Sequence, residues 1–338
     1  MGPIPCRDPF FMEQIFVENL HKTYRIAERQ PGLSGAVRGL FHRKYRTVRA
    51  LNGISFNLKK GELVGYIGPN GAGKSTTVKV LSGILVPDSG SCSVLGRIPW
   101  SERVEHVQHI GVVFGQRTQL WWDLPVVESF ELLRSIYGVS PGAYKVRLAQ
   151  LVEQLDLGSF LDTPVRQLSL GQRMRSDLAA SLLHNPELLF LDEPTIGLDA
   201  VSKLAVRAFI RELNAQHGTT VILTTHDMDD IEALCTRVMV IGDGAILSDG
   251  PLEALRKTVH SERDLIMDLE RDVEVDEHDV QIIKQENQRV HLRFDPALIS
   301  TPALIGRLTA RYPVRDLFVE NPPIEEIIAQ LYRQRAIE

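Results

Sequence analysis

The sequence predicts an α/β protein with a mainly parallel sheet and a smaller α+β unit at the end of the chain. Three observations lead to this prediction. From about residue 50 to 255, apolar runs typical of buried strands alternate with helical patterns, a glycine-rich segment joins one such strand to a helix, and the pattern changes beyond about residue 258. Such alternation is typical of parallel sheets, because each helix returns the chain to the start of the next strand.

The predicted elements of the larger domain, residues 12–257, follow in order. Residues 12–24 alternate towards a strand, and 25–49 form a basic insertion with seven arginine or lysine residues and one acid. Between 117 and 183 the pattern is mostly helical and interrupted by prolines, which predicts an inserted helical subdomain. The strands expected in the parallel sheet comprise residues 62–67, 110–114, 187–191, 220–225 and 237–241.

Residues 258–338 are expected to form a separate α+β accessory domain, because about 80 residues suffice for an independent folding unit. It contains no recognisable catalytic set, and support of a dimer and regulation are both open roles. Its expected strands are 264–269, 280–283 and 289–294, and its expected helices are 302–311 and 323–333.

Composition excludes several classes of protein. Apolar residues make up 43% and charged residues 24% of the 338 residues, as in ordinary water-soluble proteins. No apolar run approaches the roughly 20 residues that a membrane-spanning helix needs. The net charge of −5 argues against a general nucleic-acid binder. Cys6, Cys92 and Cys235 lack metal-ligand spacing, which suits a reducing cytosol.

The glycine-rich segment fills every fixed position of the Walker A pattern. Glycines are needed there because backbone N–H groups must close around a phosphate, while the lysine supplies a charge and the serine a hydroxyl for Mg²⁺. A predicted strand precedes the segment and a predicted helix follows it, so the phosphate would lie at a helix N-terminus. The residues expected to bind the triphosphate are Gly68, Pro69, Asn70, Gly71, Ala72, Gly73, Lys74, Ser75 and Thr76.

A second motif places two acids at the end of an apolar strand. Leu188 to Leu191 lead into Asp192 and Glu193, the Walker B arrangement. We expect Asp192 to lie beside Mg²⁺ together with Ser75, which leaves Glu193 free to act as a base on an attacking water.

The third motif is Leu168, Ser169, Leu170, Gly171 and Gln172, which opens a predicted helix. Here the chain resembles the ATP-binding subunits of ABC transporters, whose signature is usually Leu-Ser-Gly-Gly-Gln. Leu170 departs from that signature, whereas the serine and the second glycine, which contact phosphate in the family, are retained. A kinase or GTPase with a Walker A loop does not account for this motif.

The resemblance covers residues 12–255 and implies a RecA-like P-loop ATPase core with an antiparallel β lobe. It implies catalytic roles for Lys74, Glu193, Gln116 and His226: Gln116 resembles the Q-loop glutamine that touches the metal, and His226 the switch histidine that contacts the γ-phosphate. Asp199 matches the D-loop that crosses between two subunits. The family binds two ATP–Mg²⁺ between two head-to-tail copies, so that Lys74 of one copy and Ser169 of the other share a nucleotide.

The residue that stacks on adenine is open between two tyrosines. The family places an aromatic side chain at the end of the first strand, which favours Tyr24. Tyr45 is the rival, because it lies at a short spacing before Ala50 and Leu51.

The resemblance also implies partners. Transport would require separate permease subunits, and the chain most resembles the ATPases of ABC-2-type exporters, peripheral at the cytoplasmic side of the plasma (inner) membrane. Trp121 and Trp122 belong either to a socket for a permease helix or to the core of the helical subdomain. The basic insertion is either a solvated loop or a segment whose arginines meet anionic lipids. The alternative function is a soluble ABC-type ATPase in translation or DNA maintenance.

Overall fold

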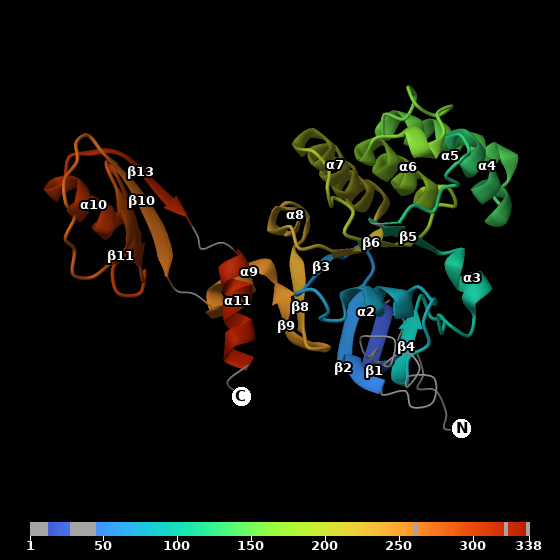
Figure 1. The fold of residues 1–338 in the computed structure, drawn as a ribbon, viewed down its shortest axis with the longest axis horizontal. Helices are drawn as coiled ribbons and strands as arrows, with labels where there is room; N and C mark the ends of the chain where they lie inside the picture. Colours follow the sequence, from blue (N-terminus) through green and yellow to red (C-terminus); the bar gives the residue numbers. More distant parts are fainter. Residues whose placement is uncertain (1–12, 28–44, 116, 260–261, 321–323, 336–338) are drawn as a thin grey trace, which may run out of the picture. The chain divides into compact units, whose positions relative to one another are not determined.

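The computed structural model divides into two compact units, residues 1–249 and 250–338, which are described separately (Figure 1). The structure describes five ranges of the chain: 13–27, 45–115, 117–259, 262–320 and 324–335.

The first unit is built on a six-stranded sheet with the order β5-β6-β7-β3-β8-β9. Five adjacent strands of this sheet, β5, β6, β7, β3 and β8, run parallel to one another, as the alternating pattern predicts. All five residues of β3 are buried, because helices or a second sheet cover both faces of such a sheet. The strands are β3 (Leu63–Ile67), β5 (Ile110–Phe114), β6 (Leu188–Asp192), β7 (Thr220–Thr224), β8 (Arg237–Gly242) and β9 (Ala245–Pro251).

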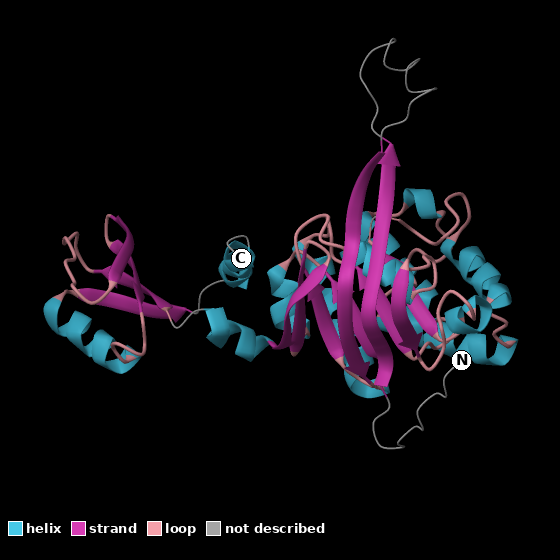
Figure 2. Cartoon of the chain, turned by 90° about the horizontal axis from the view of Figure 1, so that it is seen from below, coloured by secondary structure: helices cyan, strands magenta, loops and turns pink. Residues whose placement is uncertain are grey.

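A three-stranded antiparallel sheet, in the order β2-β1-β4, forms the predicted β lobe. Its strands are β1 (Glu13–Ala27), β2 (Tyr45–Lys59) and β4 (Ser89–Val94). Figure 2 shows the two long strands of this lobe side by side. Their pairing extends to Ala27 and Tyr45, so both ends of the predicted insertion are strand, while residues 28–44, with their helical spacing, lie outside the described residues.

Helices complete the first unit. The predicted helical subdomain contains α4, α5, a short 3₁₀ turn η1 and α6. Figure 1 shows α4, α5 and α6 grouped together, and α6 contacts β5. The helices are α2 (Lys74–Leu81), α3 (Arg103–Val107), α4 (Val126–Ile136), α5 (Pro141–Gln154), η1 (Val165–Gln167), α6 (Leu170–Leu182), α7 (Ala200–His217) and α8 (Met228–Leu234).

One hydrophobic core joins the β lobe to the parallel sheet. Ile54 and Leu58 of β2 pack in the same buried cluster as Tyr66 of β3 and Phe190 of β6. The core therefore holds the ends of β3 and β6, which carry the two predicted phosphate and metal motifs, in a fixed relation.

The second unit contains an antiparallel sheet in the order β11-β12-β10-β13. Leu304 and Leu308 of α10 share a buried cluster with apolar residues of this sheet. Strand β13, residues Val314–Glu320, is absent from the sequence-based prediction. The elements are α9 (Leu252–Val259), β10 (Arg263–Leu269), β11 (Gln281–Glu286), β12 (Arg289–Phe294), α10 (Thr301–Arg311), β13 and α11 (Ile324–Arg335).

Candidate functional site

The glycine-rich segment forms the loop between β3 and α2, as its flanking patterns predict. Gly73 caps α2 with φ of 114°, and a Cβ there would lie 2.5 Å from the Ala50 carbonyl oxygen. Only glycine fits that position. Lys74 Nζ donates to the carbonyl oxygens of Gly68 (2.6 Å) and Pro69 (3.1 Å). Burial lowers the pKa of Lys74, and the carboxylates of Glu193 and Asp192 oppose that shift.

Asp192 meets residues of two other segments at the end of β6. Ser75 Oγ donates to Asp192 Oδ1 over 3.4 Å, and the Thr224 hydroxyl donates to the same oxygen. This set of hard oxygen ligands fits Mg²⁺, which prefers one or two carboxylates completed by phosphate and water. Among the residues that the structure describes, no three or more His, Cys, Asp or Glu side chains are grouped so that they could hold a metal ion by themselves. Thr224 was absent from the sequence-based site, although its place at the end of β7 could have suggested it.

Glu193 and His226 lie together at the ends of neighbouring strands. Glu193 has φ of 57°, a left-handed conformation that is uncommon for residues other than glycine. Its N–H donates to Thr224 O over 2.9 Å, and its Oε1 lies 3.3 Å from His226 Nδ1. The structure thus brings the predicted base and the predicted switch histidine into contact.

The third motif begins α6 with a capping box. Ser169 Oγ accepts from Gln172 N–H (3.2 Å), and Gln172 Oε1 accepts from Ser169 N–H (2.9 Å). A Cβ at Gly171 would lie 2.5 Å from Ser202 Oγ, so the start of α6 and the first turn of α7 approach each other closely here. Leu170, the departure from the family signature, lies against Gly197.

Asp199 caps α7 beside this motif. Its carboxylate accepts from Ser202 N–H (2.9 Å) and from the Ser202 hydroxyl (2.7 Å). These hydrogen bonds lower the pKa of Asp199. Because Ser202 also lies against Gly171, the predicted D-loop and the start of α6 are neighbours.

Gln116 lies outside the described residues, but the segment that follows it is anchored on α6. Asp177 Oδ1 accepts from the Thr118 hydroxyl (2.8 Å) and from Gln119 N–H (3.1 Å). Burial raises the pKa of Asp177 to about 6, and these two hydrogen bonds oppose the shift. Sequence reasoning missed Asp177, although an acid on the apolar side of a helix is a visible signal.

The register of β1 and β2 separates the two tyrosines. Tyr24 pairs with Val48, and Tyr45 pairs with Ala27. Because Tyr24 and Ala27 are an odd number of residues apart on β1, the side chains of Tyr24 and Tyr45 point to opposite faces of the ribbon. Val48 is two residues from Ala50, the neighbour of Gly73, which corresponds to about 7 Å along the strand, whereas Tyr45 is about 17 Å away.

Within the described ranges, no helix is long and apolar enough to span a membrane.

Comparisons with known proteins agree with this geometry. The ABC transporter family model matches residues 51–196. The chain is 38% identical over 200 residues to the linearmycin resistance ATP-binding protein LnrL of Bacillus subtilis (strain 168), covering 59% of this chain and 64% of that protein. It is 32% identical over 222 residues to the ABC transporter ATP-binding protein NatA of the same strain, covering 66% and 90%.

Among solved structures, the chain is similar to a dimeric, post-hydrolysis state of the ATP-binding cassette MJ0796 bound to ADP and Pi. The TM-score is 0.59 at 26% identity, and the match covers 70% of this chain and 98% of that one. Because the likeness to NatA extends over nearly that whole protein, the chain belongs to the family of ABC transporter ATP-binding proteins.

Proposed function

We propose that this ABC-type ATPase binds two ATP–Mg²⁺ between two head-to-tail copies and so drives transport through separate permease subunits. The observation that carries the proposal is the meeting of Lys74, Ser75, Asp192, Glu193 and His226 at one edge of the parallel sheet. The likeness to a dimeric cassette supports the second copy.

In this proposal, each group at the sheet edge has one role. The loop from Gly68 to Thr76 and the Lys74 ammonium hold the phosphates. Ser75 and Asp192 would hold Mg²⁺, which when bound neutralises charge on the phosphates. Glu193 accepts the proton of the attacking water, and His226 donates to the γ-phosphate. Gln116, beyond the described residues, keeps its predicted role beside the metal.

The second copy would complete each site. Ser169 and the N-terminal turn of α6 present backbone N–H groups, and a helix N-terminus favours an anion. Asp199, next to this turn, would lie at the seam between copies. Since the γ-phosphate links both sides, ATP favours the closed dimer and hydrolysis releases it.

We assign adenine stacking to Tyr24, because the strand register places it nearer than Tyr45 to the phosphate loop. The Tyr24→Ala variant should bind ATP more weakly, by roughly 5- to 100-fold, as expected for loss of one stacked base. The Tyr45→Ala variant should bind normally. Equilibrium binding of ATP to both variants measures this, and a loss at Tyr45 alone contradicts the assignment.

Trp121 and Trp122 support a permease contact rather than a place in the core. Their side chains are 39% and 50% exposed in the segment that leads into α4.

The name of LnrL, a resistance protein, supports outward transport over the alternative of translation or DNA maintenance. We place the chain at the cytoplasmic face of the membrane on this basis. A lipid contact by the basic insertion, residues 25–49, remains a prediction.

Copurification from native membranes tests the function. The tagged full chain should bring down proteins with several membrane-spanning helices, and the Trp121→Ala/Trp122→Ala variant should lose them while its ATPase activity persists. Leu298→Ala, which shortens an 81% exposed apolar side chain in the second unit, is the matched control. Recovery of ribosomes or DNA in place of membrane proteins would support the alternative.

A further inference from the structure

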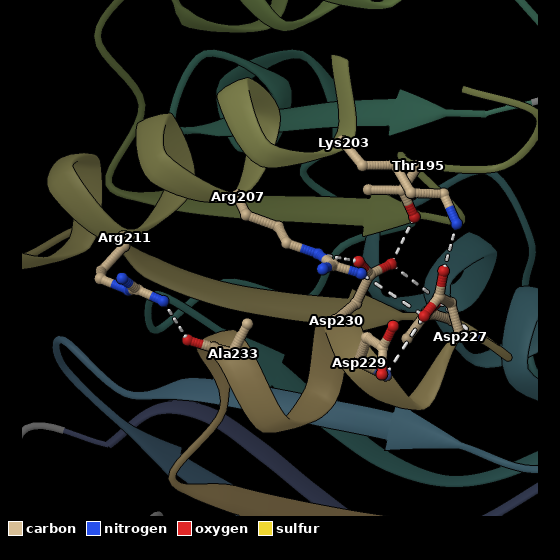
Figure 3. A network of polar contacts seen from close by, with 9 residues as sticks. Thr195, Lys203, Arg207, Arg211, Asp227, Asp229, Asp230 and Ala233 are labelled. Atoms are coloured by element: carbon tan, nitrogen blue, oxygen red, sulfur yellow. Dashed lines mark hydrogen bonds and ion pairs between the residues drawn. The ribbon is translucent and has the colours of Figure 1, made fainter. Parts of the chain in front are cut away.

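A polar network joins α7 to the segments that carry Glu193 and His226 (Figure 3). It contains two cations of α7, Lys203 and Arg207, and two acids at the start of α8, Asp227 and Asp230. Lys203, Arg207 and Arg211 recur every four residues, so they share one face of the helix.

Asp230 fixes the two loops that bear the catalytic side chains. Its side chain is fully buried and accepts from the hydroxyls of Thr195 and Thr225 and from Arg207 Nε (2.5 Å). Thr195 follows Glu193 by two residues, and Thr225 directly precedes His226. Because a buried carboxylate is costly unless it is paired, these partners are held in one arrangement.

Asp227 holds the backbone on the other side of His226. It caps α8, accepting from Asp229 N–H (3.1 Å), and its carboxylate also pairs with Lys203 and with Arg207 Nη2 (3.5 Å). The His226 side chain itself is 58% exposed. Its position therefore depends strongly on the neighbouring residues that are anchored to α7.

Helix α7 connects this network to the predicted D-loop. Asp199 caps the helix, and Lys203 and Arg207 follow one and two turns later. A helix of 18 residues is stiff over this distance, so a displacement of Asp199 is transmitted to both cations.

We propose that Lys203 and Arg207 are positioning residues, which hold His226 and Glu193 in a fixed relation to Asp199 through Asp227 and Asp230. Docking of a second copy against Asp199 would thereby align the catalytic pair. This inference rests on the proposed function, in which His226 acts on the nucleotide and Asp199 lies at the seam between copies.

The test uses Lys203→Met and Asp227→Asn in the full chain, singly and together. Both positions are partly exposed, and asparagine keeps the cap of α8, so folding should survive. We expect each single variant to lower kcat roughly 10- to 100-fold, as small misplacements of catalytic groups do, with ATP affinity nearly unchanged. The double variant should be no slower than the slower single variant, since each single variant already removes the ion pair between Lys203 and Asp227. Lys203→Arg should retain activity.

Arg211→Met is the matched control, because Arg211 Nη2 donates to Ala233 O (2.6 Å) and links the same two helices away from His226. It should leave kcat unchanged. Wild-type turnover of Lys203→Met, multiplied effects in the double variant, or parallel losses of ATP affinity and thermal stability would each overturn the proposal. His226→Ala distinguishes failure of the proposed function from failure of the network proposal. If His226→Ala retains full turnover, the role of His226 in the proposed function is wrong, and the network proposal is wrong with it. If His226→Ala is inactive while Lys203→Met is active, only the network proposal is overturned.

Discussion

Glu193→Gln should yield an ATP-stabilised dimer with very low turnover. Glutamine has nearly the same shape but does not accept the proton of the attacking water, so ATP would be bound and not hydrolysed. Loss of a general base predicts a decrease in kcat of roughly 100- to 10,000-fold. Phosphate release measures the turnover, and light scattering with and without ATP measures the dimer.

Glu187→Gln provides the control for this prediction. Glu187 lies just before β6, at the opposite end of the strand from Glu193, and pairs on the surface with His109. Its substitution should leave turnover and dimerisation unchanged. A Glu193→Gln protein that remains monomeric with ATP and hydrolyses it normally would refute both the base assignment and the dimer.

Two inactive variants should restore activity when mixed. Lys74→Met removes the phosphate-binding charge, and Ser169→Arg blocks the N-terminus of α6, so each alone should lower turnover by at least about 100-fold. In a mixed dimer, Lys74 of one chain and Ser169 of the other still form one intact site. Random pairing of equal amounts therefore predicts roughly a quarter of wild-type turnover, since half the dimers are mixed and each has one working site of two.

The mixing experiment distinguishes a shared site from a site within one chain. If Lys74 and Ser169 of the same chain served one nucleotide, no combination would contain an intact site, and the mixture would remain inactive. A mixture of Lys74→Met with Lys74→Met/Ser169→Arg provides the control, because none of its dimers has a working lysine. Activity in that control would contradict the role of Lys74.

Much of the site could be predicted because its motifs are contiguous. The segment from Gly68 to Ser75 contains the backbone freedom, the charge and the hydroxyl that phosphate binding needs, and the flanking patterns supply the strand and the helix. Asp192 and Glu193 likewise end an apolar strand. The structure brings Asp192 to Ser75, and Glu193 to His226.

Some elements of the fold could not be predicted, because pairing creates them. Strand β4 has the sequence SGSCSV, which carries little strand propensity, and it exists through its antiparallel pairing with β1. Strand β13 pairs with β10, from which it is separated by two strands and a helix of the chain. Likewise, the long β1–β2 pairing extends into residues predicted as insertion.

The phosphate loop, the acid pair and the ranges of the main parallel strands follow from the amino-acid sequence alone, because each depends on neighbouring residues and their periodicity, and the motif from Leu168 to Gln172 carries the resemblance to the family. Three sets of contacts become visible only in the folded chain: Thr224 meets Asp192, Asp177 anchors the segment after Gln116, and Lys203 and Arg207 pair with the acids of α8. These contacts join residues far apart in the chain. Their partners are selected by how helices and strands pack, which local pattern does not encode.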